Sequence, residues 1–372
     1  MKYGFFIAII LVFLSLLSYV FVCGGQVLRA FPVGRTVFYI SASLLVCAMF
    51  AGMLLGALTN LSGLKILAFV GNSAIIIFVY LIISFLLADV IRLILWMFQV
   101  SPNVILLFRR YFFLCSLLII AVSMIIGYIR YINPSITTLS LAAANSTPKG
   151  KSLKIVAASD LHLGISNDKQ RLKKFVSLIN AQNPDIVLFA GDICDNRFEP
   201  LAAQKMDEEL RQIAAPLGVY AIAGNHEYIA GNVDDKLNFY RQSNIVVLLD
   251  SVAQVSDGLY IAGRDDSSNS HRKELRQIVE NITPDNAIVL LDHQPHALQQ
   301  AADNHIALQI SGHTHDGQFF PVNLITRLLF EKSQGYLQKN STHYYIMSGL
   351  GIWGPPYRIG TRSELLVVNF EY

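Results

Sequence analysis

The hydrophobic residues of this chain follow two different patterns, one before about residue 133 and one after it. The first part contains four apolar runs, each close to or above the roughly 20 residues that cross a bilayer as a helix. These runs are Phe5–Val22, Val37–Leu58, Ile66–Ala88 and Phe112–Ile132. We therefore predict a four-helix transmembrane region at residues 1–133. A cleaved signal peptide is the alternative for the first run, but its long apolar core favours a retained helix.

The second part alternates short apolar runs with longer polar-apolar segments from Lys154 onwards. The apolar runs predict strands, and the longer segments predict helices. The expected strands are 154–158, 186–190, 218–223, 259–262, 287–291, 306–310, 343–347 and 364–370, and the expected helices are about 168–182, 200–214, 233–243 and 271–281. This alternation is typical of an α/β or α+β domain, expected at 153–372. Residues 134–152 are rich in Ser, Thr and Pro and are interpreted as a linker.

The charged residues also differ between these two parts of the chain. Residues 1–133 carry eight basic residues and one acidic residue, Asp89, whereas the remainder carries 21 basic and 25 acidic residues. An acidic soluble domain argues against a polyanion such as nucleic acid as a partner. The hydrophobic fraction of 53% is high for a soluble protein. Membrane lipids are therefore expected partners, and the chain is expected to be an integral membrane protein.

The membrane orientation rests on the basic residues near the spans. With four spans, the loops at 23–36 and 92–111 share a side that holds five arginines, while Lys2, Lys65 and Arg130 lie on the other. This excess favours a location outside the cytoplasm for the soluble domain at 153–372. When Lys149 and Lys151 are also counted, the two sides carry equal numbers of basic residues.

Asp89 and Arg92, three residues apart, are interpreted as an interfacial pair, with a transport path as the alternative.

Polar motifs follow the first three predicted strands of the second part. Asp160 and His162 form an Asp-x-His step directly after 155–158. Asp192 and Asp195 belong to Gly191-Asp192-Ile193-Cys194-Asp195 after 186–190. Asn225 and His226 belong to Gly224-Asn225-His226-Glu227 after 218–223. Each motif alone also fits an ordinary turn or helix cap.

Two further motifs contain histidine. His293 follows 288–291, and a lone histidine is more often a structural residue than a ligand. His313 and His315 form Gly312-His313-Thr314-His315 after 306–310, and this His-x-His spacing favours a metal site. His296 and His305 are interpreted as ordinary surface or core residues.

The ordered set of five motifs resembles the calcineurin-like metallophosphoesterases, over about residues 153–372. The layout, including Trp353-Gly354-Pro355-Pro356, is similar to the bacterial membrane-associated branch of this family. The resemblance implies a two-sheet β-sandwich flanked by helices. It also implies a binuclear metal centre and hydrolysis of phosphate esters or anhydrides by attack of a metal-bridging hydroxide.

The resemblance assigns a role to each motif residue. One metal would be held by Asp160, His162, Asp192 and His315, and the other by Asp192, Asn225, His293 and His313. A set of carboxylate, amide and imidazole without thiolate favours Mn, Fe or Zn. By resemblance His226 is not a ligand but stabilises the transition state or protonates the leaving oxygen, and Asp195 orients its ring.

The substrate class is narrowed by one departure from the family pattern. Some members place an arginine directly after the second aspartate of Gly-Asp-x-x-Asp, whereas here Asn196 takes that place and Arg197 follows. This favours a phosphodiester or pyrophosphate, with a lipid-linked substrate as one candidate, over a dianionic monoester. A phosphomonoesterase of the same fold is the first alternative. A non-catalytic membrane scaffold or sensor is the second, disfavoured because all seven expected ligands are present.

An apolar stretch, 319–330, follows the fifth motif directly. The first interpretation of this stretch is that it belongs to the hydrophobic core or packs as a cap over the site. The second is that it forms an apolar lid that docks on the bilayer. By resemblance Trp353, Tyr357 and Arg358 are expected at the mouth of the site.

Overall fold

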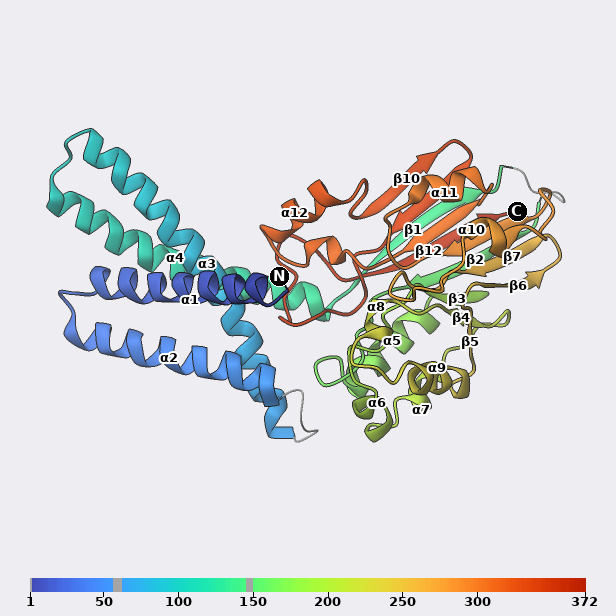
Figure 1. Cartoon of the computed structure of the whole chain (residues 1–372), viewed down its shortest axis with the longest axis horizontal. Coiled ribbons are helices and arrows are strands. Elements are labelled where there is room, and N and C mark those ends of the chain that lie inside the picture. The colour runs from blue at the N-terminus through green and yellow to red at the C-terminus, as the bar shows by residue number, and fades with distance from the viewer. Residues whose placement is uncertain (1, 56–61, 145–149) are drawn as a thin grey trace. The chain divides into compact units, whose positions relative to one another are not determined.

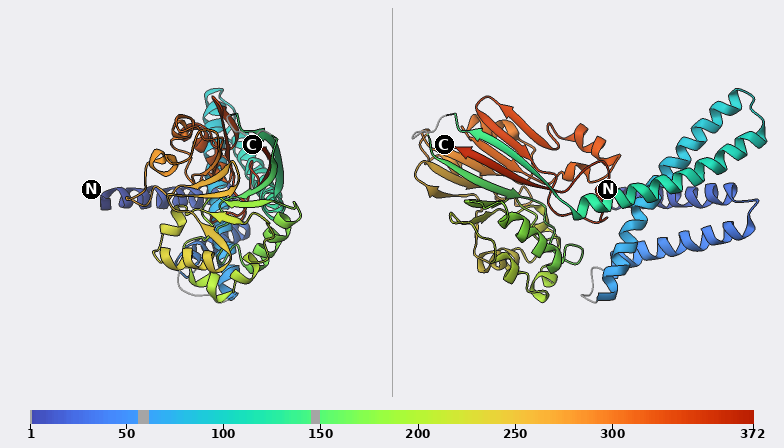
Figure 2. Two further views of the ribbon diagram at one scale, coloured as in Figure 1. Left: turned by 90° about the vertical axis from the view of Figure 1, so that its right-hand side faces the viewer. Right: turned by 180° about the vertical axis from the view of Figure 1, so that it is seen from behind.

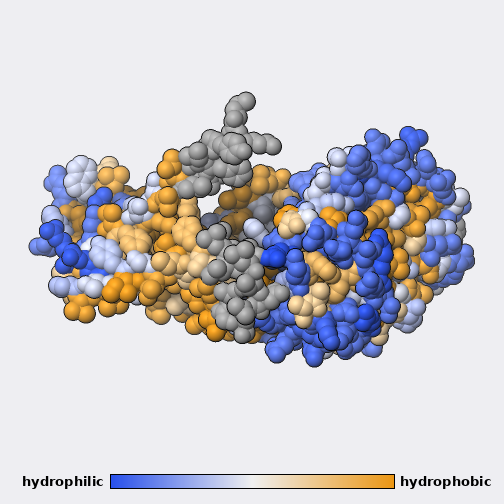
Figure 3. Space-filling model, turned by 60° about the horizontal axis from the view of Figure 1, so that its bottom comes forward, coloured by the Kyte–Doolittle hydropathy of each residue, from blue (hydrophilic) through white to orange (hydrophobic). Residues whose placement is uncertain are grey.

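The computed structural model describes residues 2–55, 62–144 and 150–372 (Figure 1). The chain forms two compact units, Met1–Ile126 and Gly127–Tyr372, called here the helical unit and the sheet unit. On the face drawn in Figure 3, the helical unit is more apolar than the sheet unit, which is largely hydrophilic. This contrast agrees with the two patterns in the sequence.

Four helices form the N-terminal part of the chain: α1 (Lys2–Val27), α2 (Pro32–Leu55), α3 (Ser62–Met97) and α4 (Pro102–Ile132). Among the residues that the structure describes, three stretches are long and apolar enough to cross a membrane, namely Pro32–Gly52, Lys65–Met97 and Pro102–Ile132. In α1 the described apolar stretch is the shorter Leu11–Val27, so the expected count of four spans is not confirmed. The end of the second expected span, 56–58, lies outside the described residues.

Asp89 joins three helices of the helical unit. Its carboxylate accepts a hydrogen bond of 2.8 Å from the Tyr19 hydroxyl of α1 and lies 3.5 Å from a guanidinium nitrogen of Arg109 on α4. Arg92, on the same helix as Asp89, is 3.6 Å away. These contacts hold the helices together, which supports a structural role for Asp89 rather than a transport path.

The sheet unit contains two six-stranded mixed sheets. The first has the order β1 (Ser135–Ala142), β12 (Glu364–Glu371), β2 (Ser152–Ala158), β3 (Ile186–Phe189), β4 (Val219–Ala221), β5 (Ile245–Val247). The second has the order β10 (Gly335–Lys339), β11 (Thr342–Ile346), β9 (Leu308–Ser311), β8 (Ala287–Leu291), β7 (Leu259–Gly263), β6 (Ser251–Ser256). All eight expected strands are present. The strands β1, β5, β6 and β10 were not expected.

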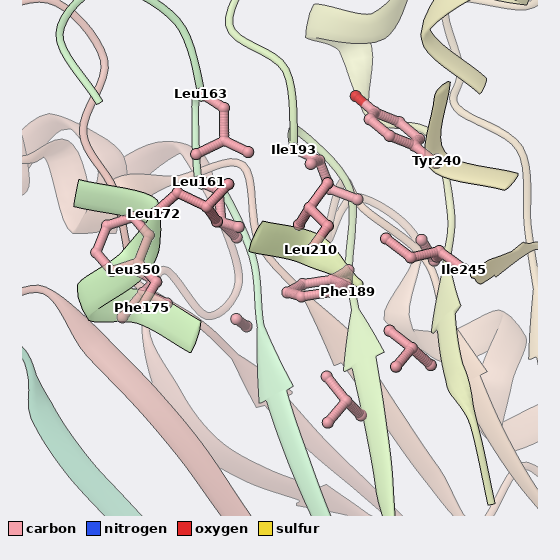
Figure 4. Close-up of a cluster of buried hydrophobic side chains, with 14 of the residues drawn as sticks. Leu161, Leu163, Leu172, Phe175, Phe189, Ile193, Leu210, Tyr240, Ile245 and Leu350 are labelled. Carbon is pink, nitrogen blue, oxygen red and sulfur yellow. The ribbon is translucent and has the colours of Figure 1, made fainter. Parts of the chain in front are cut away.

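The main core lies between the two sheets, and strand alternation builds it. Ile155 and Ala157 of β2 face the second sheet, whereas Val156 and Ala158 face the helices on the outer side. That outer layer contains α5 (Lys169–Asn180), α6 (Glu199–Ala203), α7 (Asp207–Leu210) and α9 (Val233–Gln242), some of whose buried side chains are drawn in Figure 4. On the far face of the second sheet lie α10 (Leu275–Val279) and α11 (Leu298–Asp303).

The expected linker 134–152 differs from the structure at 135–142, which form β1. This strand pairs in parallel with β12 from Ser135 opposite Glu364 to Ala142 opposite Glu371. Leu139 and Leu141 pack against the core between the sheets, whereas Ile136 on the other face is exposed. The Ser and Thr residues that indicated a linker are compatible with an edge strand, because Thr and Ile both favour extended backbone. Linker residues 145–149 lie outside the described residues.

We predict that about half of the backbone amides of 135–142 exchange slowly with solvent, because the alternate N–H groups that face β12 are hydrogen-bonded to it, whereas the others lie on the open edge of the sheet. Hydrogen exchange of the full chain in detergent, read by mass spectrometry of the peptide that contains these residues, measures this directly. Exchange as fast as in an unstructured peptide would show that 135–142 is a linker after all.

Candidate metal centre

The ends of five parallel strands position the candidate ligands. Strands β2, β3 and β4 run parallel in the first sheet, and β8 and β9 run parallel in the second. Carboxyl ends of parallel strands meet at one edge of a sheet, where side chains from separate loops converge. The seven residues expected as ligands all follow these ends: Asp160 and His162, Asp192, Asn225, His293, and His313 with His315.

Three of these residues form a first group. The Nε2 atoms of His162 and His315 lie 3.0 Å apart. Asp160 Oδ1 is 3.4 Å from His315 Nε2 and 4.0 Å from His162 Nε2. Asp160 is held in place by its neighbours, because it accepts hydrogen bonds from the Ser159 hydroxyl and from the backbone N–H of His313.

A second group contains Asn225, His293 and His313 beside Asp192. Asn225 Oδ1 is 2.9 Å from His313 Nδ1 and 3.2 Å from His293 Nε2. His293 Nδ1 lies 2.7 Å from the backbone carbonyl of Ala190, to which its N–H donates, so Nε2 is left free to face the site. The sequence motifs thus bring the expected ligands together in two adjacent groups.

Asp192 lies between the two groups. Its Oδ2 atom is 3.1 Å from His293 Nε2 and 3.8 Å from His162 Nε2. Its other oxygen, Oδ1, accepts a 2.8 Å hydrogen bond from the backbone N–H of His226. One oxygen therefore faces an imidazole of each group while the other fixes the orientation of the carboxylate.

Burial and mutual charge set the protonation of these groups. Burial lowers the pKa of His313 to about 4 and also lowers the pKa of His315 well below its usual value, so both rings are neutral at pH 7. Burial also lowers the pKa of His293, but the Asp192 carboxylate more than offsets this and raises it overall. Burial would raise the pKa of Asp192, yet the neighbouring His293, His162 and His226 together outweigh it and the net shift is downward.

The donor set fits divalent cations. One ligand atom from each of Asp160, His162 and His315 lies within 4.8 Å of the other two, and the same holds for Asp192, His293 and His313. Burial raises the pKa of Asp160, which means that the protein alone disfavours its negative charge. A cation between these atoms would bind imidazole lone pairs and compensate buried carboxylates at once.

The backbone at the site is strained. Positive φ angles of 45° to 70° occur at five of the seven expected ligands: Asp160, His162, Asp192, His313 and His315. Such conformations are unfavourable for residues with a Cβ and cluster at functional sites. Gly224 permits the close packing here, since a Cβ at this position would overlap the carboxylate of Asp192. These angles help to aim five side chains toward the site, at a conformational cost for residues that carry a Cβ.

His226 lies beside the first group. Its Nδ1 donates to the backbone carbonyl of Asp195 at 2.8 Å, whereas the Asp195 carboxylate is 3.5 Å away. The backbone of Asp195 is thus the closer partner of the ring. Asp195 Oδ1 also lies 3.5 Å from His162 Nδ1, between the two rings. Burial lowers the pKa of His226, but Asp195 more than offsets this and the net shift is upward.

Two fully buried residues support the site and carried no signal in the sequence beyond their place near a motif. Glu227 accepts hydrogen bonds from the backbone N–H groups of Asp192, Cys194 and Gly224. Lys236 on α9 donates to the backbone carbonyls of His226, Glu227 and Ile229 at 2.9 to 3.1 Å. Together they fix two of the motif loops against each other.

The expectation for the mouth of the site is correct only for Trp353. This residue is 55% exposed, and its ring centroid is 6.0 Å from that of His226. Arg358 is fully buried instead, and its guanidinium donates to the backbone carbonyls of His315, Gly349 and Gly351. Tyr357 is also buried. From sequence alone, an arginine such as Arg358 that donates to backbone carbonyls looks the same as an arginine that binds a substrate.

Comparison with known proteins supports a phosphoesterase. The family model for calcineurin-like phosphoesterases matches residues 153–317. A Bos taurus protein described as a transmembrane protein with metallophosphoesterase domain is 32% identical, over 62% of this chain and 56% of the relative. A Bacillus subtilis protein described as an uncharacterized metallophosphoesterase is 31% identical, over 66% of this chain and 89% of the relative. An Aquifex aeolicus protein, also described as an uncharacterized metallophosphoesterase, is 32% identical over 60% of this chain and 87% of the relative.

The animal relatives are longer than the matched region. The chain spans 56% of the Bos taurus relative and 60% of a Danio rerio relative with the same description. The two bacterial relatives are covered almost entirely, at 87% and 89% of their length.

We predict that Lys236→Met lowers the free energy of unfolding by about 1–3 kcal/mol, because it leaves three buried carbonyls without their donor. Thermal unfolding of the full chain in detergent measures the loss. Lys174→Met is the matched control, since Lys174 is an exposed residue of α5. Equal melting temperatures for the two variants would contradict the supporting role of Lys236.

Proposed function

The chain belongs to the calcineurin-like metallophosphoesterase family, and from this premise we propose that it is a membrane-anchored, two-metal phosphoesterase. It hydrolyses a phosphodiester or a phosphoanhydride. The observation that carries the proposal is the placement of Asp192, whose Oδ2 faces an imidazole of each ligand group. A carboxylate so placed is suited to bridge two cations.

Seven side chains would hold the ions. Asp160, His162, Asp192 and His315 would bind one, and Asp192, Asn225, His293 and His313 the other, with Mn, Fe or Zn as candidates. Two such ions would neutralise phosphate charge and make a water molecule acidic enough to act as a nucleophile at neutral pH. The neutral rings of His313 and His315 suit this role, because a ligating imidazole must offer its lone pair.

His226 is proposed to donate a proton to the leaving group. Its Nδ1 is engaged by the Asp195 carbonyl, so Nε2 is the nitrogen left to donate a proton. The raised pKa of His226 favours the protonated ring that a general acid requires. Asp195 supports this state through both its backbone carbonyl and its carboxylate.

A diester or anhydride suits the charges near the site better than a monoester does. Arg197 directly follows Asn196, which stands at the position where some family members carry a phosphate-holding arginine. Its Nε is 3.1 Å from the Glu199 carboxylate, and its side chain is 38% exposed. A dianionic monoester would need a further cation that Arg197, paired in this way, does not supply.

The catalytic unit is proposed to lie outside the cytoplasm, attached by the apolar helices. The loops assigned to the cytoplasmic side hold Arg29, Arg35, Arg92, Arg109 and Arg110. Basic residues accumulate on the cytoplasmic side of membrane proteins. A substrate with a lipid part is consistent with this attachment.

The first test is hydrolysis of bis(p-nitrophenyl) phosphate by the full chain in detergent, with and without added Mn²⁺. We predict metal-dependent turnover that Asp192→Asn abolishes, together with loss of bound metal measured by elemental analysis. The amide lacks the charge that compensates two cations. Metal-independent turnover, or full activity of Asp192→Asn, would contradict the proposal.

We predict that His226→Ala retains both metals but lowers kcat by about 10²–10⁴, because it removes only the proton donor. Metal content and turnover are measured on the same preparation. Loss of metal in this variant would show instead that His226 is a ligand or a structural residue. His305→Ala, at an exposed residue outside both ligand groups, serves as the matched control.

A further inference from the structure

We propose that the exposed apolar face of α12 lies on the surface of the membrane that anchors the chain, and that the metal site receives an amphiphilic substrate from this bilayer. Helix α12 spans Val322–Leu329. The α12 face is defined here as Phe320, Leu324, Ile325, Leu328 and Leu329. The substrate part of this inference rests on the function proposed above, whereas the docking part does not.

Helix α12 exposes its apolar side chains and buries a polar one, the reverse of a helix on the surface of a soluble protein. Leu328 is 87% exposed and Leu329 is 73% exposed, with Ile325, Leu324 and Phe320 at 53%, 47% and 46%. The buried residue of this helix is polar, since Asn323 is only 6% exposed. Helices of soluble proteins place apolar residues inward. An outward apolar face with an exposed arginine, Arg327, is typical of helices that lie in a membrane interface.

The end of a membrane-spanning helix lies within the same unit. The last residues of α4, Gly127–Ile132, belong to the sheet unit. There Tyr128 and Ile129 are 39% and 50% exposed, and Arg130 is exposed as well. Tyrosine and arginine are enriched where helices leave the bilayer. The water–membrane boundary is therefore expected near these residues.

Short contacts connect this end of α4 to α12. The backbone N–H of Arg358 donates to the Gly127 carbonyl at 3.0 Å, and a Cβ at position 127 would meet the side chain of Ile359. The carbonyl of Ile359 in turn accepts a 2.8 Å hydrogen bond from the N–H of Phe320. Phe320 lies two positions before the first residue of α12. Figure 2 shows α12 and the end of α4 at the same end of the sheet unit. The α12 face is thus close to the level at which α4 leaves the bilayer.

The same helix borders the metal site. Phe330, directly after α12, stacks on His296 with ring centroids 5.1 Å apart and lies 6.2 Å from the ring of His313. Arg327 Nε is 3.8 Å from the carboxylate of Asp316, which follows His315. A headgroup phosphate at the metal site would therefore lie beside an apolar helix. The substrate that fits this arrangement has a phosphodiester or phosphoanhydride headgroup and acyl chains that stay in the bilayer.

The docking part is tested by tryptophan fluorescence in vesicles. The full chain carries Leu328→Trp in a background of Trp96→Phe and Trp353→Phe, and is placed in phosphatidylcholine–phosphatidylglycerol vesicles that contain brominated lipid. Asp285→Trp in the same background is the control. Asp285 is exposed and precedes β8, whereas His293 follows the opposite end of that strand. We expect brominated lipid to quench Trp at position 328 at least about twofold more strongly than at 285, since only an inserted ring meets acyl chains. Equal quenching would overturn the docking, including the case in which a second protein covers α12.

The substrate part is tested with two phosphodiesters that share a leaving group. Vesicle-borne phosphatidyl-p-nitrophenol and soluble bis(p-nitrophenyl) phosphate are given to the unmodified chain and to a Leu328→Glu, Leu329→Glu variant. We expect the variant to lose about tenfold of its turnover on the lipid and to keep its turnover on the soluble ester. Equal loss on both substrates, or no loss on either, would overturn delivery from the bilayer. Absence of turnover of both esters by the unmodified chain would contradict the proposed function, while the quenching result would still decide the docking.

Discussion

The structure depends on keeping one carboxylate, Asp192, buried and charged between two groups of histidines. A buried carboxylate without partners would become protonated. Here the facing His293 keeps its pKa low, and the N–H of His226 fixes its Oδ1 atom. The surrounding strand ends supply further nitrogen and oxygen donors within a few ångströms. Divalent cations are the natural partners for such a set, because they compensate the carboxylates and bind the neutral imidazoles at once.

The loops that carry these donors are held by buried charges rather than by packing alone. Glu227 binds three backbone N–H groups from two motifs, and Lys236 binds three carbonyls of the third motif and its continuation. On the other side Arg358 binds three carbonyls, including that of His315. Burial lowers the pKa of Arg358 to about 10, so it remains charged at neutral pH. These contacts offset the strain of the positive φ angles at the ligands.

Much of this could be predicted from sequence, for a physical reason. The eight expected strands are apolar runs buried on both faces, and the ligands follow them within a few residues, so both signals are local. What was missed depends on contacts between distant parts of the chain. Strand β1 is polar on one face and is recognised only through its pairing with β12, more than 220 residues later. Arg358 was expected at the mouth of the site by resemblance, and its burial could not be predicted because its backbone partners, such as the Gly349 carbonyl, leave no mark in a sequence.

The β1 strand leaves little chain between α4 and the sheets. Only two residues separate the end of α4 at Ile132 from the start of β1 at Ser135. The guanidinium of Arg171 donates to the carbonyls of Tyr131 and Ile132, and the Tyr131 hydroxyl donates to Asn167 at 2.7 Å. Arg358 completes the connection, since its N–H binds Gly127 of α4 and its guanidinium binds the loop of His315. These hydrogen bonds attach Gly127–Ile132, which belong to the sheet unit, to the loop of His315, so the apolar helix beside the site lies near the residues at which α4 is expected to leave the bilayer.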